Sequence, residues 1–242
     1  IVSVSGLLAG MDAFGIEKTA LIASLCPPLS TPRIAGPALV ALRRAIHRRG
    51  GAAHRAALAM YGNSVKDDGT VDLLGVPHEV KVQPRNDEVL EDVARHPGRL
   101  AGWVFVNPAG PVDPLTEVQR CLEQDGMVGV KAHPYWHNYT VSLLMDCAAF
   151  CQEIGWPMLV HLGPGQNGDF RALPETFPRL NVVYAHAGIP YGPLVCDYAR
   201  DKPGVHVDLS SAAYVDARIA ADAIKRAGAD KCLFGTDGPY FH

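Results

Sequence analysis

The sequence lacks any hydrophobic run long enough to cross a bilayer, and it lacks a strong excess of either charge. No apolar stretch approaches the roughly 20 residues that a membrane-spanning helix needs. The chain also opens without the charged and apolar regions of a secretory signal. Its 22 Lys and Arg residues nearly balance 25 Asp and Glu residues, which leaves a formal net charge of −3. We therefore expect neither nucleic acid nor a membrane surface as a partner.

Cysteine is scarce and scattered. The six cysteines form no CxxC pair and lack the dense spacing of a small disulfide-bonded secreted domain. This usage favours reduced thiols and a cytoplasmic protein. Cys147 and Cys151 stand four residues apart beside Phe150, where we expect core packing rather than metal binding.

One short run of basic residues comes closest to a charged patch. Its members are Arg43, Arg44, His47, Arg48 and Arg49. They follow apolar residues at helical spacing, which favours a solvated helix face over a phosphate-binding patch.

The chain has a hydrophobic content of 48% and an alternating pattern of strands and helices. Short apolar runs predict strands at 16–25, 100–106, 127–132, 157–162, 181–185, 205–209 and 231–234. Amphipathic stretches predict helices at 5–14, 37–49, 115–122, 141–154, 169–177, 194–200 and 215–227. Such alternation implies parallel strands joined by right-handed crossovers.

The fold class that follows is α/β, with the eight-stranded (β/α)8 TIM barrel as the natural candidate and a doubly wound open sheet as the alternative. Seven predicted strands are one fewer than a closed barrel needs, and the missing strand is the first. The residues at the amino end, 5–14, are instead predicted to form a helix, which Ser3 or Ser5 can cap and which ends at Gly15. We therefore expect a single barrel domain over 1–242 that lacks most of the first strand and the last helix. The irregular stretch 50–82, rich in Gly and His, is expected to form an insertion or lid over one barrel face.

Polar residues follow the carboxyl ends of most of the later strands. These ends read Lys131-Ala132-His133-Pro134, Val160-His161-Leu162-Gly163, Ala185-His186-Ala187-Gly188 and Gly235-Thr236-Asp237-Gly238-Pro239, while the strand at 205–209 contains Asp208. In a parallel barrel these ends meet at one mouth. Imidazole nitrogens and a carboxylate converging there are what Zn²⁺ requires, with a position open for water or substrate. Two histidines and an aspartate at equivalent strand ends therefore predict a metal or catalytic site, with Asp208 as a partner of a ligand histidine.

The motifs KAHP, VHLG, AHAG and GTDGP, in this order, resemble the amidohydrolase superfamily. So do the stretches LLAGMDAFGIEKTAL and NDEVLEDVARHPGRLAGWVFVNP. The closest resemblance is to the amidohydrolase-related (amidohydrolase 2) branch, which includes metal-dependent hydrolases and the decarboxylases of aminocarboxymuconate semialdehyde and hydroxybenzoates.

The resemblance implies a divalent metal, Zn²⁺ above all, as one or two ions. It implies His161 as a metal ligand and His186 as a ligand of a second metal or a catalytic residue. Asp237 would bind metal and move the proton of the attacking water. Lys131 would be a carboxylated bridge between two metals or a plain lysine that contacts substrate, and His133 would line the substrate pocket. His137, with Trp136 and Tyr139, belongs to the loop after the strand at 127–132; it would either contact substrate or, as we expect, lie in an ordinary surface loop.

One family feature is absent from the sequence. Members carry His-x-His at the end of the first strand, whereas this chain opens Ile1-Val2-Ser3-Val4-Ser5. Either serines replace those histidines, or the chain as given starts just after the motif; the helix at 5–14 favours the second account. We accordingly expect the 242 residues alone to bind zinc weakly.

Three functions follow from these features. The first is a metal-dependent hydrolase that acts on a small amide, lactone or ester through a metal-activated water. The alternative is a metal-dependent, non-oxidative decarboxylase of an aromatic or enoic acid. The second alternative is a degenerate, non-catalytic barrel, should the His-x-His be truly absent. The expected partner is a small-molecule substrate, with a homodimer as the default assembly.

Overall fold

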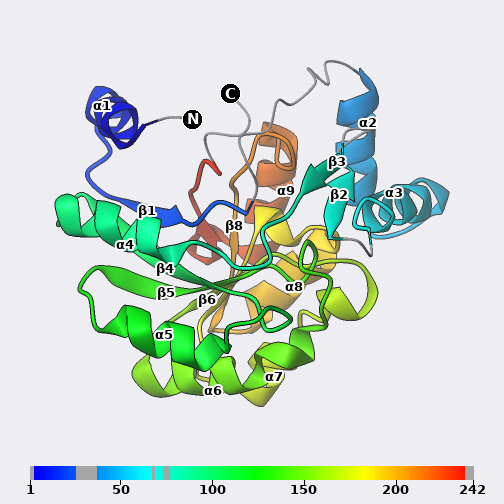
Figure 1. Cartoon of the computed structure of the whole chain (residues 1–242). Helices are drawn as coiled ribbons and strands as arrows, with labels where there is room; N and C mark the ends of the chain where they lie inside the picture. Colours follow the sequence, from blue (N-terminus) through cyan, green and yellow to red (C-terminus); the bar gives the residue numbers. More distant parts are fainter. Residues whose placement is uncertain (1–2, 26–36, 67–68, 73–76, 238–242) are drawn as a thin grey trace.

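A curled parallel sheet of seven strands forms the centre of the protein (Figure 1). The computed structural model describes residues 3–25, 37–66, 69–72 and 77–237. Within these residues the sheet order is β1-β4-β5-β6-β7-β8-β9, and every neighbouring pair is parallel. The strands are β1 (Thr19–Ile22), β4 (Leu100–Val106), β5 (Met127–Ala132), β6 (Met158–Val160), β7 (Val182–Tyr184), β8 (Val205–Asp208) and β9 (Cys232–Leu233). This is the TIM-barrel type of α/β fold with seven strands, as the sequence predicts.

The sheet is open within the described part of the chain, because no ladder joins β9 to β1 there. A helix precedes β1, as expected: α1 spans Val4–Phe14. The Ser3 side chain accepts a hydrogen bond from the Gly6 N–H at 3.1 Å, and Gly15 ends the helix at a φ of 67°. Ser3 and Ser5 therefore stand at a helix start and not at a strand end.

Most helices follow their predicted strands around the outside of the sheet. They are α2 (Pro37–Ile46), α5 (Pro114–Leu122), α6 (Met145–Ile154), α7 (Ala172–Thr176), α8 (Gly192–Asp201) and α9 (Ala217–Ala227), with a 3₁₀ turn at Val141–Leu144 before α6. Figure 1 shows α4 to α7 along one outer side, with α2 and α3 at the opposite side from α1.

The expectation of irregular structure at 50–82 is wrong for the described residues. They contain α3 (Ala52–Gly62) and an antiparallel pair, β2 (Thr70–Asp72) with β3 (Pro77–Glu79). A further helix, α4 (Asn86–Arg95), also lacks a counterpart in the prediction. Its apolar residues Val89, Leu90 and Val93 are buried, and Asp87 and Glu88 lie in its first turn, where acidic side chains favour a helix start.

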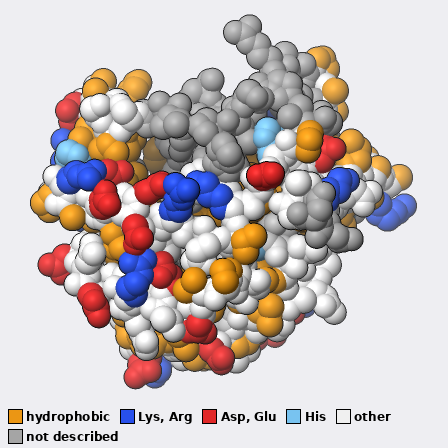
Figure 2. All heavy atoms as spheres, viewed as in Figure 1, with side chains coloured by type: hydrophobic (Ala, Val, Ile, Leu, Met, Phe, Trp, Pro, Cys, Tyr) orange, Lys and Arg blue, Asp and Glu red, His pale blue; other side chains and the backbone are white. Residues whose placement is uncertain are grey.

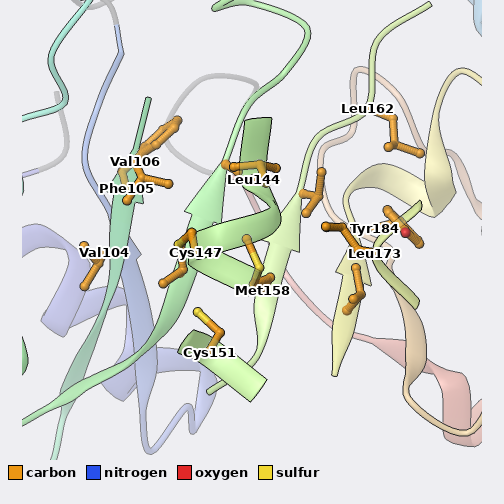
Figure 3. Packing of buried hydrophobic residues seen from close by; sticks show 14 of the residues in the cluster. Val104, Phe105, Val106, Leu144, Cys147, Cys151, Met158, Leu162, Leu173 and Tyr184 are labelled. Atoms are coloured by element: carbon orange, nitrogen blue, oxygen red, sulfur yellow. The ribbon is translucent and has the colours of Figure 1, made fainter. Parts of the chain in front are cut away.

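The core lies between the sheet and the helices that cover it (Figure 3). Val104 and Met158 on the strands are fully buried, and so are Leu144 and Leu173 from the helical layer. Cys147 and Cys151 have exposed fractions of 2% and 0%, so the prediction that they pack in the core is confirmed. Cys26 lies outside the described residues.

The surface carries mixed charge. Figure 2 shows acidic and basic side chains interspersed on the visible face. The basic run at 43–49 is mostly the expected solvated face, since Arg44, Arg48 and Arg49 are exposed, but the Arg43 side chain is only 13% exposed. Its Nε donates to the Ala213 carbonyl at 2.9 Å, and its guanidinium lies 3.7 Å from the Asp216 carboxylate. Among the described residues, no helix is long and apolar enough to span a membrane.

Candidate active site

Six polar side chains meet at the carboxyl ends of five neighbouring strands, and we call them the strand-end cluster. They are Lys131 in β5, His133 just after it, His161 after β6, His186 after β7, Asp208 at the end of β8 and Asp237 after β9. Five of them are at most 9% exposed, whereas the Asp237 side chain is 34% exposed. The cluster is therefore buried except on its Asp237 side.

The three histidines of the cluster contact one another in chain order. The ring centroids of His133 and His161 lie 4.0 Å apart in a stacked pair, and those of His161 and His186 lie 4.8 Å apart, edge to face. Nε2 of His186 lies 3.9 Å from the nearer Asp237 carboxylate oxygen. The structure thus brings together the residues that the strand-end pattern singled out.

His186 is held by a chain of hydrogen bonds that starts at Asp208. The Ser210 hydroxyl donates to the Asp208 carboxylate through a short hydrogen bond and lies 2.9 Å from Nδ1 of His186. Because the carboxylate only accepts, the single hydroxyl proton goes to Asp208, and Nδ1 of His186 donates to Ser210. Asp208 also accepts from the backbone N–H of His186 at 3.2 Å. This arrangement leaves Nε2 of His186 as the nitrogen that can exchange a proton beside Asp237.

Lys131 is a buried amine beside two carboxylates. Burial lowers the pKa of Lys131 to about 8, while the negative charges of Asp208 and Asp237 act in the opposite direction. The lysine thus remains mostly cationic at neutral pH and becomes neutral in mildly alkaline solution. Burial likewise lowers the pKa of His133 and of His161 well below the usual value, so both imidazoles are neutral at pH 7.

Tyrosine rings surround the histidines. Tyr61 from α3 stacks on Tyr135 with centroids 4.1 Å apart, and its hydroxyl lies 2.9 Å from Nε2 of His161. Tyr214, from the loop after β8, stacks on His186 at 5.0 Å. Burial raises the pKa of Tyr61 well above its usual value, so its phenol keeps its proton. The tyrosines thus give the histidines a largely aromatic environment, in which His133 and His161 are neutral.

The loop after β5 differs from the expected surface loop. Tyr135 and Tyr139 are 3% and 4% exposed, and Nε2 of His137 donates to the Lys81 carbonyl at 3.1 Å. Nδ1 of His133 accepts from the Trp136 N–H at 3.1 Å, so the neutral His133 carries its proton on Nε2. This loop is part of the site's interior.

Unusual backbone conformations gather at the same strand ends. Five non-glycine residues in the described chain have positive φ angles: Asn138, His186, Ala187, Ser211 and Asp237. Four of them lie in the loops after β7, β8 and β9. Such conformations cost energy and persist where the surrounding structure enforces them, as is common at functional sites.

The donor chemistry of the cluster suits a divalent metal, but the described residues do not complete a metal site. His161, His186 and Asp237 provide nitrogen and oxygen donors of the kind that Zn²⁺ takes. In the described part, however, no group of three His, Cys, Asp or Glu side chains is arranged to hold an ion. Nε2 of His161 is hydrogen-bonded to Tyr61 instead.

With this fold and site in place, sequence comparison identifies the family. The chain belongs to the amidohydrolase family, whose model (Amidohydro_2) matches residues 37–242. This confirms the resemblance that the strand-end motifs carry. No curated protein sequence matches the chain.

Several known structures share the fold at low sequence identity. A 2,6-dihydroxybenzoate decarboxylase from Rhizobium is 20% identical with a TM-score of 0.56, and the match covers 98% of this chain and 77% of that one. An uncharacterised TIM-barrel protein from Bordetella bronchiseptica is 19% identical with a TM-score of 0.54, over 92% and 87% of the two chains. A probable 2-pyrone-4,6-dicarboxylic acid hydrolase from Acinetobacter baumannii is 12% identical with a TM-score of 0.56, over 98% and 74%. These similarities establish the fold.

Sequence reasoning missed the tyrosines of the site. Tyr135 lies two residues after His133, and Tyr214 lies in the loop after Asp208, so both stand in strand-end loops that the same pattern already marked. Nothing in the sequence near Tyr61 indicates its role, because its position depends on how α3 packs over the strand ends.

Proposed function

We propose that this chain decarboxylates a small aromatic acid. The observation that carries the proposal is the buried, mostly cationic Lys131, in the same cluster as histidines that tyrosine rings contact. A lysine ammonium can pair with the carboxylate or phenolate of such a substrate. Tyrosine and histidine rings offer faces on which a planar ring can stack. The shared fold with a 2,6-dihydroxybenzoate decarboxylase supports the same chemistry.

His186 would supply the proton for this reaction. Its protonated Nε2 would deliver a proton to the ring carbon that bears the carboxylate, forming a C–H bond. The C–C bond to the carboxylate then breaks, carbon dioxide leaves, and its electron pair restores the aromatic ring. His186 is left neutral with its proton on Nδ1, the nitrogen that donates to Ser210. Asp237, partly exposed and 3.9 Å from Nε2, would return a proton from solvent.

The remaining cluster residues would position these groups. Asp208 and Ser210 fix the orientation of His186. His133 would offer its Nε2–H to an oxygen of the substrate. Residues 1–242 would act as one catalytic unit, with the segment 50–82, which contains Tyr61, as its cover.

Hydrolysis of a small amide, lactone or ester is the second candidate. It is favoured by the match to a probable 2-pyrone-4,6-dicarboxylic acid hydrolase, which has the same TM-score as the Rhizobium decarboxylase. In that reaction Asp237 would accept the proton of the attacking water, while Lys131 would stabilise the developing oxyanion.

The test supplies the chain with 2,6-dihydroxybenzoate, 5-carboxyvanillate and 2-pyrone-4,6-dicarboxylate. Assays with added Zn²⁺ or Mn²⁺ and assays with a chelator run side by side, and released carbon dioxide is measured separately from ring opening. We expect carbon dioxide from an aromatic acid and no ring opening of the pyrone. Ring opening without carbon dioxide would replace the proposal by the second candidate.

Two variants assign the roles of the residues. His186→Gln and Asp237→Asn should each lower kcat by about 100-fold, the usual scale for a lost proton-transfer group. Asp230→Asn, an exposed aspartate next to β9, is the matched control and should change kcat less than about twofold. Full activity of His186→Gln would remove His186 from the reaction.

A further inference from the structure

A cavity of about 670 Å³ lies apart from the strand-end cluster, among α2, α8 and α9. Its wall includes Ala187, the residue after His186, but none of the six cluster residues. Its volume is within the range of small-molecule sites in proteins. The reaction proposed above makes no use of this cavity.

The wall of the cavity has an excess of positive charge. Three arginines line it, Arg44, Arg48 and Arg218, together with one acidic residue, Asp222. That carboxylate is already bound by Arg226, whose Nε lies 2.7 Å away. Within the described residues, Arg48 and Arg218 have no ion-pair partner, and Arg44 reaches Asp216 only at 3.6 Å.

Two further features of the wall suit an anion. The helix α8 begins there with Gly192 and Pro193, and the amino end of a ten-residue helix carries partial positive charge. His47 packs against this helix start, because a Cβ at Gly192 would lie only 2.6 Å from its Nδ1. Nε2 of His47 is buried and has no hydrogen-bond partner among the residues described.

The rest of the wall is apolar. Alanines from three helical segments line it, namely Ala41, Ala45, Ala53 and Ala223, together with Ile219. A ligand that fits this wall has an apolar body and an anionic group. Arginine binds carboxylate and phosphate groups through two parallel hydrogen bonds, which a lone backbone site cannot provide.

We propose that this cavity binds a small organic anion, with its carboxylate or phosphate group on Arg48 and Arg218 and its apolar body against the alanines. Arg48, an exposed member of the basic run at 43–49, then belongs to a binding site. A ligand here would also connect α2 to α8 and α9, next to the loop that carries His186.

The test measures binding to the full chain by isothermal titration calorimetry, with phenyl phosphate, benzoate and inorganic phosphate as probes. We expect saturable binding at one site per chain for phenyl phosphate or benzoate, and weaker binding of inorganic phosphate, which has no apolar body. The stronger of the two organic probes identifies the preferred anionic group. Equal or tighter binding of inorganic phosphate would overturn the apolar part of the proposal.

Two double variants and a filled cavity locate the site. Arg48→Gln with Arg218→Gln should weaken binding about tenfold or more, since it removes both charge-assisted contacts to the anionic group. Arg55→Gln with Arg179→Gln removes the same charge from exposed positions outside the cavity and should change affinity less than about twofold. Ala41→Trp, which fills the cavity without changing charge, should also abolish binding. Equal losses in both double variants, or the absence of saturable binding, would overturn the proposal.

Discussion

Gly188, which follows His186 in the loop after β7, allows a stability prediction with a matched control. Its φ is +74°, and a Cβ built on it would lie 2.6 Å from Cβ of Val195 and 2.7 Å from its Cγ1. Gly155, at the end of α6, has a φ of +76°, and its Cβ would meet nothing within 4 Å. Replacing either glycine with alanine costs the same backbone strain, about 1–2 kcal/mol. Only Gly188→Ala adds the overlap with Val195.

The overlap should dominate the difference between the two variants. Val195 is fully buried in α8, so it cannot move aside without disturbing the core, and such overpacking costs about 1–3 kcal/mol. We expect Gly155→Ala to lower the free energy of unfolding by about 1–2 kcal/mol and Gly188→Ala by about 2–5 kcal/mol. Urea titration followed by circular dichroism, with an unchanged slope, measures both. Equal losses in the two variants would refute the packing argument.

Three further predictions concern the site and its titration. Tyr61→Phe should lower the free energy of unfolding by about 1–3 kcal/mol, because it leaves a buried nitrogen of His161 without its hydrogen-bond partner. In the control Tyr191→Phe, the lost hydroxyl accepts from the Gly165 N–H near the surface, and the cost should be less than about 1 kcal/mol. Similar urea midpoints for the two variants would contradict this prediction. The 242-residue chain should retain less than one zinc ion per chain after dialysis, and stoichiometric zinc by atomic absorption would show that the ligands are misassigned. Burial lowers the pKa of His137 to about 4. As the pH falls from about 6.5 to about 4, His137 therefore binds a proton in the unfolded chain but not in the folded chain, which favours unfolding. The free energy of unfolding falls between pH 7 and pH 4, and in His137→Gln this fall should be smaller by up to about 3 kcal/mol. If the free energy of unfolding depends on pH equally in the variant and the parent, His137 does not contribute to the fall.

Regular alternation made most of the fold predictable from the sequence. The predicted strands at 100–106 and 127–132 have the same bounds as β4 and β5. Their ends are easy to place, because each is an apolar run between turn residues. The helix α4 was missed although Val89, Leu90 and Val93 lie on one of its faces.

The site was predictable where it depends on the sheet and unpredictable where it depends on packing between distant segments. Parallel strands bring His161 and His186 to one end of the sheet, so their proximity follows from topology. The contact between Tyr61 and His161 joins residues one hundred positions apart in the chain. No local pattern encodes that contact, because it requires α3 to be packed over the strand ends.

The ion pairs that fasten α2 and the turn after it to the barrel give this part of the protein its own response to ionic strength. Arg43 and Arg44 reach Asp216 at the start of α9, and Arg49 pairs with Asp197 in α8. Raising the salt concentration from about 0.01 M to about 1 M shortens the screening length from about 30 Å to about 3 Å, which weakens the more exposed pairs of Arg44 and Arg49 and leaves the apolar core intact. Because α3 follows α2 directly, the Tyr61 contact over His161 becomes salt-sensitive, while the sheet beneath it does not.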